Sequence, residues 1–224
     1  RSSSSAASDV YKRQIPSSMI DALVATEDER FYSHSGIDFK GTARALFYLG
    51  SKGGGSTITQ QLARQLFTGV RSRNKLEAVI QKIKEWVIAI RLERRYTKSE
   101  IITMYLNIYD FNYNADGIRS ASAIYFSKMP KEMSLSESAM LVGMLKNSSL
   151  YNPLRRPELV RERRNIVYQQ MLRNNLINQK EKDSLAALPI EVDFNPQSHR
   201  EGIATYFRAY LQKFMRSWIA NNPK

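Results

Sequence analysis

Apolar residues recur with helical spacing along almost the whole chain from Ile15 onward. The longest such pattern covers residues 75–96, where one stripe of the helix carries Leu76, Val79, Ile80, Ile83, Val87 and Ile90. Further helices are predicted over 16–27, 98–108, 117–126, 134–146, 157–173 and 202–219. Only 188–194 has the pattern of a short strand. The periodicity therefore predicts a mainly α fold class.

The composition of the chain limits the partners, metal sites and membrane segments that it can have. The net charge of +13 predicts an anionic partner, which is a nucleic acid, a phospholipid surface or a phosphorylated substrate. The absence of cysteine excludes disulfides and thiolate zinc sites. Two histidines without an HExxH motif predict no histidine-based metal site. No apolar run approaches the roughly 20 residues of a membrane-spanning helix, so a membrane anchor is not expected within this chain.

Three segments are expected along the chain. Residues 1–14 combine a low-complexity stretch with a sequence that resembles the translation of a sequencing adapter, and we exclude them as an artefact from fold reasoning. Residues 15–190 are predicted to form the functional domain. Residues 191–224 are predicted to be a linker and an amphipathic helix that lead toward a missing C-terminal region. An adapter implies a truncated gene, so a signal or membrane anchor is expected to have preceded Ile15.

Three acids and a histidine surround one glycine turn within residues 27–38. Glu27 lies at the predicted end of an apolar helix, directly before Asp28 and Glu29. A carboxylate that faces a cleft beside other acids suits a general base. The alternative interpretation is a solvated acidic helix end without a catalytic role.

A glycine-rich loop with the sequence Gly-Gly-Ser-Thr-Ile-Thr-Gln-Gln-Leu follows at 54–62. Ser56 or Thr57 can cap the next helix, and Thr57 with Gln60 fits a capping box. Free amides at such a helix start favour a phosphate. The loop is not a Walker loop, because no Gly-Lys-Ser/Thr follows at the required spacing. A purely structural glycine turn is the alternative.

The third motif is Gln-Lys-Ile-Lys-Glu at 81–85. Glu85 falls on the helix face opposite the apolar stripe, at roughly 100° per residue, and Lys82 lies one turn earlier. A surface ion pair with no function is the alternative, and it would contribute only tenths of a kcal/mol.

In this order the motifs resemble those of the peptidoglycan glycosyltransferases, membrane-associated enzymes that polymerise lipid II into glycan strands. The family pattern Glu-Asp-x-x-Phe-x-x-His-x-Gly-x-Asp is complete, at Glu27, Asp28, Phe31, His34, Gly36 and Asp38. Residues 100–107 resemble the Ile-Leu-x-x-Tyr-Leu-Asn helix of the family, and the likeness covers about residues 17–175. The chain departs from the family at Arg64 and Gln65, where lysine and asparagine are usual, and at Gln81, where arginine is usual.

The resemblance implies a lysozyme-like, two-lobed glycosyltransferase domain with two acids in its active site. Glu27 would be the catalytic base, and Glu85 the second acid. The implied substrate-binding residues are Asp28, His34, Ser56, Thr57, Gln60, Gln61, Arg64, Lys82 and Asn107, with Glu137 as a weaker candidate. The resemblance leaves open whether a divalent cation, magnesium or manganese, binds at the diphosphate of the substrate. Glu85 would either hold such an ion or position the cationic side chains.

The implied reaction joins lipid II units into β-1,4 glycan strands. The donor N-acetylmuramic acid is inverted at C1, and undecaprenyl pyrophosphate is released. The expected partners are lipid II, the growing glycan strand and a membrane surface, at the extracytoplasmic, periplasmic face of the bacterial inner membrane. A transpeptidase domain or other proteins of cell-wall synthesis are further expected partners.

Two rival functions remain open at this stage. A lysozyme-like hydrolase would use two carboxylates but needs no cationic loop for a diphosphate. A nucleic-acid-binding module would follow from charge alone, yet no nucleic-acid motif is present, so no such partner is expected. The chain is also predicted not to bind penicillin, because its Ser-x-x-Lys at 72–75 lacks a later Lys-Thr-Gly. The basic run at 155–164 is predicted to be a solvated helix face, with a lipid contact as the alternative.

Overall fold

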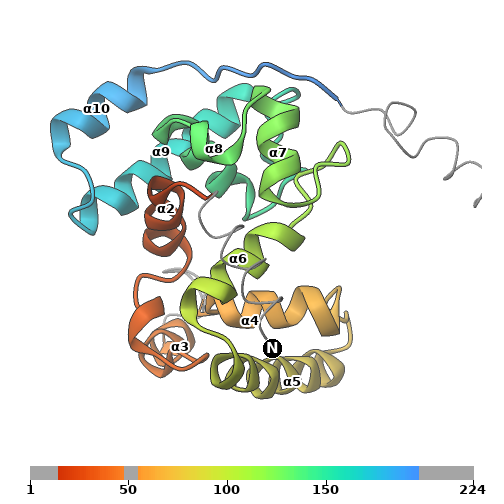
Figure 1. The fold of residues 1–224 in the computed structure, drawn as a ribbon. Coiled ribbons are helices and arrows are strands. Elements are labelled where there is room, and N and C mark those ends of the chain that lie inside the picture. Colours follow the sequence, from red (N-terminus) through yellow and green to blue (C-terminus); the bar gives the residue numbers. More distant parts are fainter. Residues whose placement is uncertain (1–14, 48–54, 197–224) are drawn as a thin grey trace, which may run out of the picture.

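The computed structural model describes residues 15–47 and 55–196, which form helices joined by short loops (Figure 1). The α-helices are α2 (Ser17–Glu27), α3 (Phe39–Phe47), α4 (Ile58–Ala63), α5 (Lys75–Arg95), α6 (Lys98–Ile108), α7 (Gly117–Phe126), α8 (Leu135–Met144), α9 (Pro157–Arg173) and α10 (Gln179–Ala187). Two 3₁₀ turns, η1 (Phe31–Ser33) and η3 (Pro130–Glu132), and a π-helical segment, η2 (Arg64–Thr68), which directly follows α4, complete the list. Strand pairing in the described part is limited to one isolated bridge, between Asp110 and Asp116. The predicted mainly α class is confirmed.

The helices predicted within the described residues are all present, with ends that agree to within about two residues. The strand predicted over 188–194 is wrong. That segment runs extended across the core, where Ile190, Val192 and Phe194 pack against buried residues. Its alternating pattern therefore reflects one-sided packing and not a sheet. The helix predicted over 202–219 and the segment 1–14 lie outside the described residues.

Sequence patterns did not predict α3 or α10. Both are short, and α10 carries no buried residue, so its apolar period is weak. Its start is nevertheless marked by a capping box, in which Asn178 accepts from the Glu181 amide and the Glu181 side chain accepts from the Asn178 amide. Such a cap stabilises a helix start without any contribution from burial.

The helices form two lobes (Figure 1). In one lobe α2, α8 and α9 pack together, and α10 lies against α9. In the other lobe α4 packs on α5. Helix α6 contacts α4 in this lobe and also α7, which Figure 1 shows in the first lobe, so α6 joins the two lobes. This arrangement confirms the two-lobed architecture.

Helix α5 is oriented against the usual rule. An amphipathic helix normally turns its apolar stripe toward the core. In α5 the stripe is between 45% and 75% exposed, at Leu76, Val79, Ile80, Ile83 and Val87. Glu85, on the opposite face as predicted, is buried. The face that carries Glu85, together with Ala89 and Leu92, is therefore the buried one. Within the described residues, no helix combines the length and apolar composition that crossing a bilayer requires.

Candidate active site

A cleft of about 830 Å³ is lined by residues from both lobes. The end of α2, at residues 27–29, supplies acidic groups to the lining, and the loop at 55–57 lines the same cleft. Cationic side chains complete the lining, at Arg64, Lys146, Arg163 and Arg173. An acidic patch and a basic patch therefore border the same space.

Glu27 is the last residue of α2, where the chain leaves the helix at Asp28. Each of its carboxylate oxygens has a partner from a different part of the fold. Oε2 accepts a hydrogen bond from Gln61 Nε2 at 3.0 Å, and Oε1 lies 3.5 Å from the Arg163 guanidinium. An ionised carboxylate only accepts hydrogen bonds, so both partners suit the charged form.

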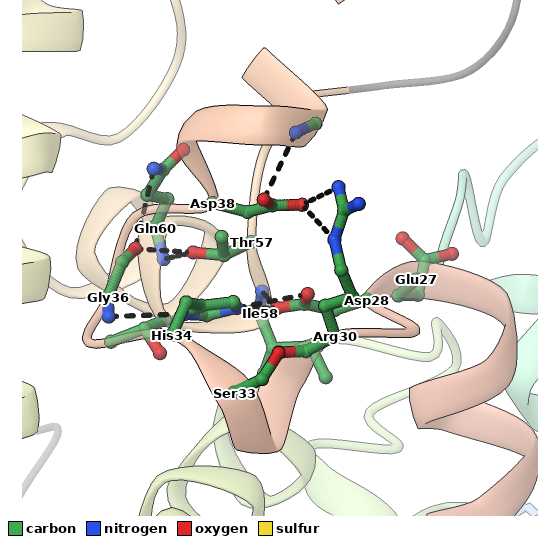
Figure 2. A network of polar contacts seen from close by, with 12 residues as sticks. Glu27, Asp28, Arg30, Ser33, His34, Gly36, Asp38, Thr57, Ile58 and Gln60 are labelled. Carbon is green, nitrogen blue, oxygen red and sulfur yellow. Dashed lines mark hydrogen bonds and ion pairs between the residues drawn. The ribbon is translucent and has the colours of Figure 1, made fainter. Parts of the chain in front are cut away.

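Asp28 and His34 lie in a buried network beside Glu27 (Figure 2). The carboxylate of Asp28 accepts from the Ile58 amide at 3.0 Å and from His34 Nε2 at 3.0 Å. His34 Nδ1 accepts from the Gly36 amide at 3.2 Å, so the proton of a neutral ring lies on Nε2. The network ties the end of α2 to the start of α4. Figure 2 shows Glu27 pointing away from it. Substrate contact by Asp28 or His34 stays a prediction.

Gly36 closes this network against α5. Its φ is +93°, and a Cβ built there would lie 2.8 Å from the backbone of Ala89. Only glycine fits such a position. Its carbonyl accepts from the Thr57 hydroxyl at 2.7 Å. The glycine of the first motif therefore holds the second motif in place.

Thr57 caps α4, as predicted, because its hydroxyl oxygen accepts from the Gln60 amide. The reciprocal half of the predicted capping box does not form, since Gln60 Nε2 is directed to the Gly36 carbonyl instead. Two amides at this helix start are not free for a phosphate, and phosphate binding by the others stays a prediction. Asp28 occupies the Ile58 amide, and Thr57 occupies the Gln60 amide.

The neighbouring glutamines of α4 reach in different directions. Gln61 contacts Glu27, whereas Gln60 Oε1 accepts from Lys82 Nζ at 3.1 Å. Successive helical side chains are rotated by roughly 100°, so one short helix contacts both charged groups. Helix α4 therefore links the predicted base to the predicted cationic site.

Lys82 and Glu85 form the ion pair that the third motif predicts, at 3.2 Å. Lys82 Nζ also donates to the Ser56 hydroxyl at 2.8 Å, which places the amine beside a residue that lines the cleft. Burial lowers the pKa of Lys82, the carboxylate of Glu85 opposes that shift, and the nearby charges of Arg64 and Arg71 add to it. The pair is half-buried and built into the fold, so the surface-pair alternative is wrong.

The prediction of a solvated basic face on α9 is correct for Arg161 but wrong for Arg163 and Arg164. Arg161 is 48% exposed and pairs with Glu158, whereas Arg163 and Arg164 are buried. Arg164 donates to Ser136 and to the carbonyls of Leu188 and Pro189, which fixes the extended segment after α10. Arg163 reaches Glu27. The sequence pattern could have predicted this burial, because both arginines share a helical stripe with the buried Val160, Val167 and Met171.

The remaining predicted site residues divide between cleft and scaffold. Arg64 lines the cleft at the end of α4. Asn107 lies near the end of α6, where its backbone packs against Gly117, apart from the cleft lining. Glu137 caps α8 and pairs with Lys128 at 2.7 Å, which is a structural role.

Comparison with known proteins gives one consistent family. A family model described as "Transglycosylase" matches residues 2–172. Penicillin-binding protein 1A of Haemophilus influenzae is 40% identical over 90% of this chain and 23% of that protein. Penicillin-binding protein 1A of Escherichia coli is 37% identical over 93% and 24%. Penicillin-binding protein 1F of Bacillus subtilis is 37% identical over 89% and 28%. The chain thus spans about a quarter of the length of these relatives.

A solved structure is also similar. The 2.6 Å crystal structure of penicillin-binding protein 1A from Haemophilus influenzae aligns with a TM-score of 0.42 and 30% sequence identity, over 56% of this chain and 18% of that chain.

Proposed function

The chain belongs to the transglycosylase family, and from this membership we propose that it polymerises lipid II into β-1,4 glycan strands of peptidoglycan. The observation that carries the proposal is the presence of both groups in the lining of one cleft. Glu27 lines it, and so does Ser56, whose hydroxyl accepts a hydrogen bond from the Lys82 amine. Transfer of a glycosyl group from a diphosphate donor to a hydroxyl requires a proton acceptor and a cationic site at the same cleft.

In the proposed reaction Glu27 removes the proton from the 4-hydroxyl of the acceptor N-acetylglucosamine. The oxygen attacks C1 of the donor N-acetylmuramic acid, with inversion, and the bond from C1 to undecaprenyl pyrophosphate breaks. The diphosphate gains negative charge as it leaves, so Lys82 and Arg64 stabilise the transition state. Glu85 holds Lys82 in place and takes no part in proton transfer.

A divalent cation at the diphosphate is a separate proposal. Within the described residues, no group of three acids or histidines is arranged to hold a metal ion. Glu85, the nearest candidate, already pairs with Lys82. A magnesium or manganese ion here would take most of its ligands from the diphosphate and water, and no step above depends on it.

Incubation with labelled lipid II tests the proposed function against its rivals. Polymer formation supports glycosyl transfer. Cleavage of finished glycan without polymer would favour the lysozyme-like hydrolase, and salt-dependent retention of DNA without either activity would favour a nucleic-acid module.

We also propose that the exposed stripe of α5 contacts a membrane surface. Its apolar residues continue onto the preceding turn, where Leu66, Phe67 and Val70 are exposed. Arg71, Arg73 and Lys75 lie between these two groups in the sequence. An apolar face flanked by cations is typical of helices that lie in the interface of an anionic bilayer. This contact would hold the cleft beside its lipid-linked substrate, at the extracytoplasmic face of a bacterial membrane.

The double substitution Ile80→Asn with Ile83→Asn is expected to weaken binding to vesicles of anionic phospholipid. Two half-exposed isoleucines that enter the interface contribute about 1 kcal/mol or more each, so affinity should fall by roughly tenfold to a hundredfold. Vesicle flotation measures the bound fraction. Leu154→Asn with Leu176→Asn, two exposed positions of the other lobe, is the matched control. Equal losses in both pairs would contradict the assignment of this face.

Replacing Arg64 or Lys82 by alanine is expected to weaken binding of a labelled phosphoglycolipid inhibitor such as moenomycin. A charge-assisted phosphate contact contributes about 1.5–3 kcal/mol, which corresponds to roughly tenfold to more than a hundredfold in affinity. Titration at fixed salt measures the loss. Arg161→Ala, on the exposed face of α9, should cost little. Equal losses at all three positions would mean that diffuse charge carries the binding.

The relatives named above are penicillin-binding proteins, and this chain corresponds to about a quarter of their length. We propose that a transpeptidase domain, or a separate cell-wall synthesis protein, acts on the strands that this domain makes. The growing glycan strand would be their shared substrate.

A further inference from the structure

Tyr105 is a buried residue of α6 that does not line the cleft. Its hydroxyl nevertheless reaches the candidate base through one intermediate. Tyr105 Oη donates to Gln61 Oε1 at 2.9 Å, and Gln61 Nε2 donates to Glu27 Oε2 at 3.0 Å. The three side chains come from α6, α4 and α2. A single chain of hydrogen bonds therefore connects the junction of the lobes to the cleft.

The chemistry of the three groups fixes which group donates and which accepts in these two hydrogen bonds. Burial, with the nearby charge of Glu27, raises the pKa of Tyr105 well above its usual value, so the phenol keeps its proton and acts as the donor. The amide oxygen of Gln61 is then committed to Tyr105, and its NH₂ group is committed to Glu27. A rotated amide would set its oxygen against the carboxylate and its NH₂ against the phenol proton.

Gln61 depends on Tyr105 for this orientation. Gln61 is only partly buried and lines the cleft, so without the phenol its amide would be free to rotate toward water or a bound sugar. Glu27 would then keep Arg163 on one oxygen and lose its fixed partner on the other.

We propose that Tyr105 is a positioning residue that acts through Gln61 and fixes the carboxylate of Glu27 for proton transfer. The inference rests on the proposed function, in which Glu27 is the base. It also changes the expected role of Gln61, which becomes a support of the base in place of a substrate ligand. A proton acceptor must be held in line with the hydroxyl that it deprotonates, and small misplacements lower the rate steeply.

Tyr105→Phe removes one oxygen atom and leaves the ring in the core. We expect kcat for lipid II polymerisation to fall by at least about tenfold, the loss that follows from one misdirected hydrogen bond, with KM nearly unchanged. Tyr125→Phe is the matched control. Tyr125 is also fully buried, and its hydroxyl donates to the Phe111 carbonyl at 2.6 Å, which leads away from the cleft. Its variant should lose stability and keep kcat.

A double-mutant cycle separates positioning from general loss of packing. If Tyr105 acts through Gln61, then Tyr105→Phe in a Gln61→Ala background should lower kcat little further. Thermal unfolding of every variant measures the cost to the fold. Normal kcat in Tyr105→Phe, an equal fall in Tyr125→Phe, or full additivity with Gln61→Ala would each overturn the inference. Failure of the unmodified chain to make polymer would instead overturn the proposed function, and this inference with it.

Discussion

Glu27→Gln is expected to lower polymerisation by about 10²–10⁴-fold, the range typical of a lost general base. Glutamine keeps the shape of the side chain but cannot accept the proton of the acceptor hydroxyl. It also presents an NH₂ group where the carboxylate had an oxygen. Both oxygens of Glu27 face donors, Gln61 on one side and Arg163 on the other, so one donor would meet another donor. A loss of stability of about 1 kcal/mol is therefore expected as well.

Initial rates with labelled lipid II, together with thermal unfolding, distinguish the two effects. Glu158→Gln is the control, since Glu158 is a largely exposed carboxylate of α9, and its variant should retain full activity. Near-normal turnover by folded Glu27→Gln would disprove the mechanism. A loss of activity that merely follows the unfolded fraction would do the same.

Glu85→Gln is expected to lower the polymerisation rate by about 10²–10³-fold, the cost typical of losing one preorganised charge at a developing anion. In the proposed mechanism Glu85 acts on Lys82 and not on the acceptor hydroxyl, so the effect comes through Lys82. Without a carboxylate at 3.2 Å, the half-buried amine loses its opposing charge and its fixed position beside Ser56. Glu27 keeps both of its own partners.

Binding measurements identify this route. Glu85→Gln should weaken binding of the phosphoglycolipid inhibitor, because the diphosphate site is disturbed, whereas Glu27→Gln should leave that binding nearly unchanged. Glu77→Gln is the matched control on α5, since Glu77 is exposed near its start. Full activity in Glu85→Gln would return that residue to a structural role.

Local sequence signals predicted most of the helices, because each has its own period, cap or terminating residue. Helix α8 starts at a capping box formed by Ser134 and Glu137, at the predicted start of this helix. In the turn after α6, Asn112 adopts a positive φ of +67°, a conformation that asparagine tolerates better than most residues. The place of Glu27 at the end of α2 also followed from local pattern. These features depend on residues within about one turn of each other, so a single sequence contains them.

Which face of α5 is buried did not follow from the sequence. The apolar stripe of α5 has a strong helical period, but period alone does not tell whether protein or lipid covers it. The helical stripe that contains Arg163 and Arg164 could have predicted their burial, but it could not have predicted their distant partners, which are Glu27 for the first and the carbonyls at 188 and 189 for the second. Long-range pairs of this kind decide whether a charged side chain faces solvent or a site.

Helix α4 is only six residues long, and this has a consequence for how such domains can diverge. Inserting or deleting one residue at 58–63 would turn every later side chain by roughly 100°. A change of this kind before Gln60 would therefore separate Gln60 from Lys82 and Gln61 from Glu27 together. Change in this segment is therefore restricted to replacement of one side chain by another. Insertions and deletions are expected in the loops outside this helix, where no two neighbouring side chains have to contact two separate charged groups.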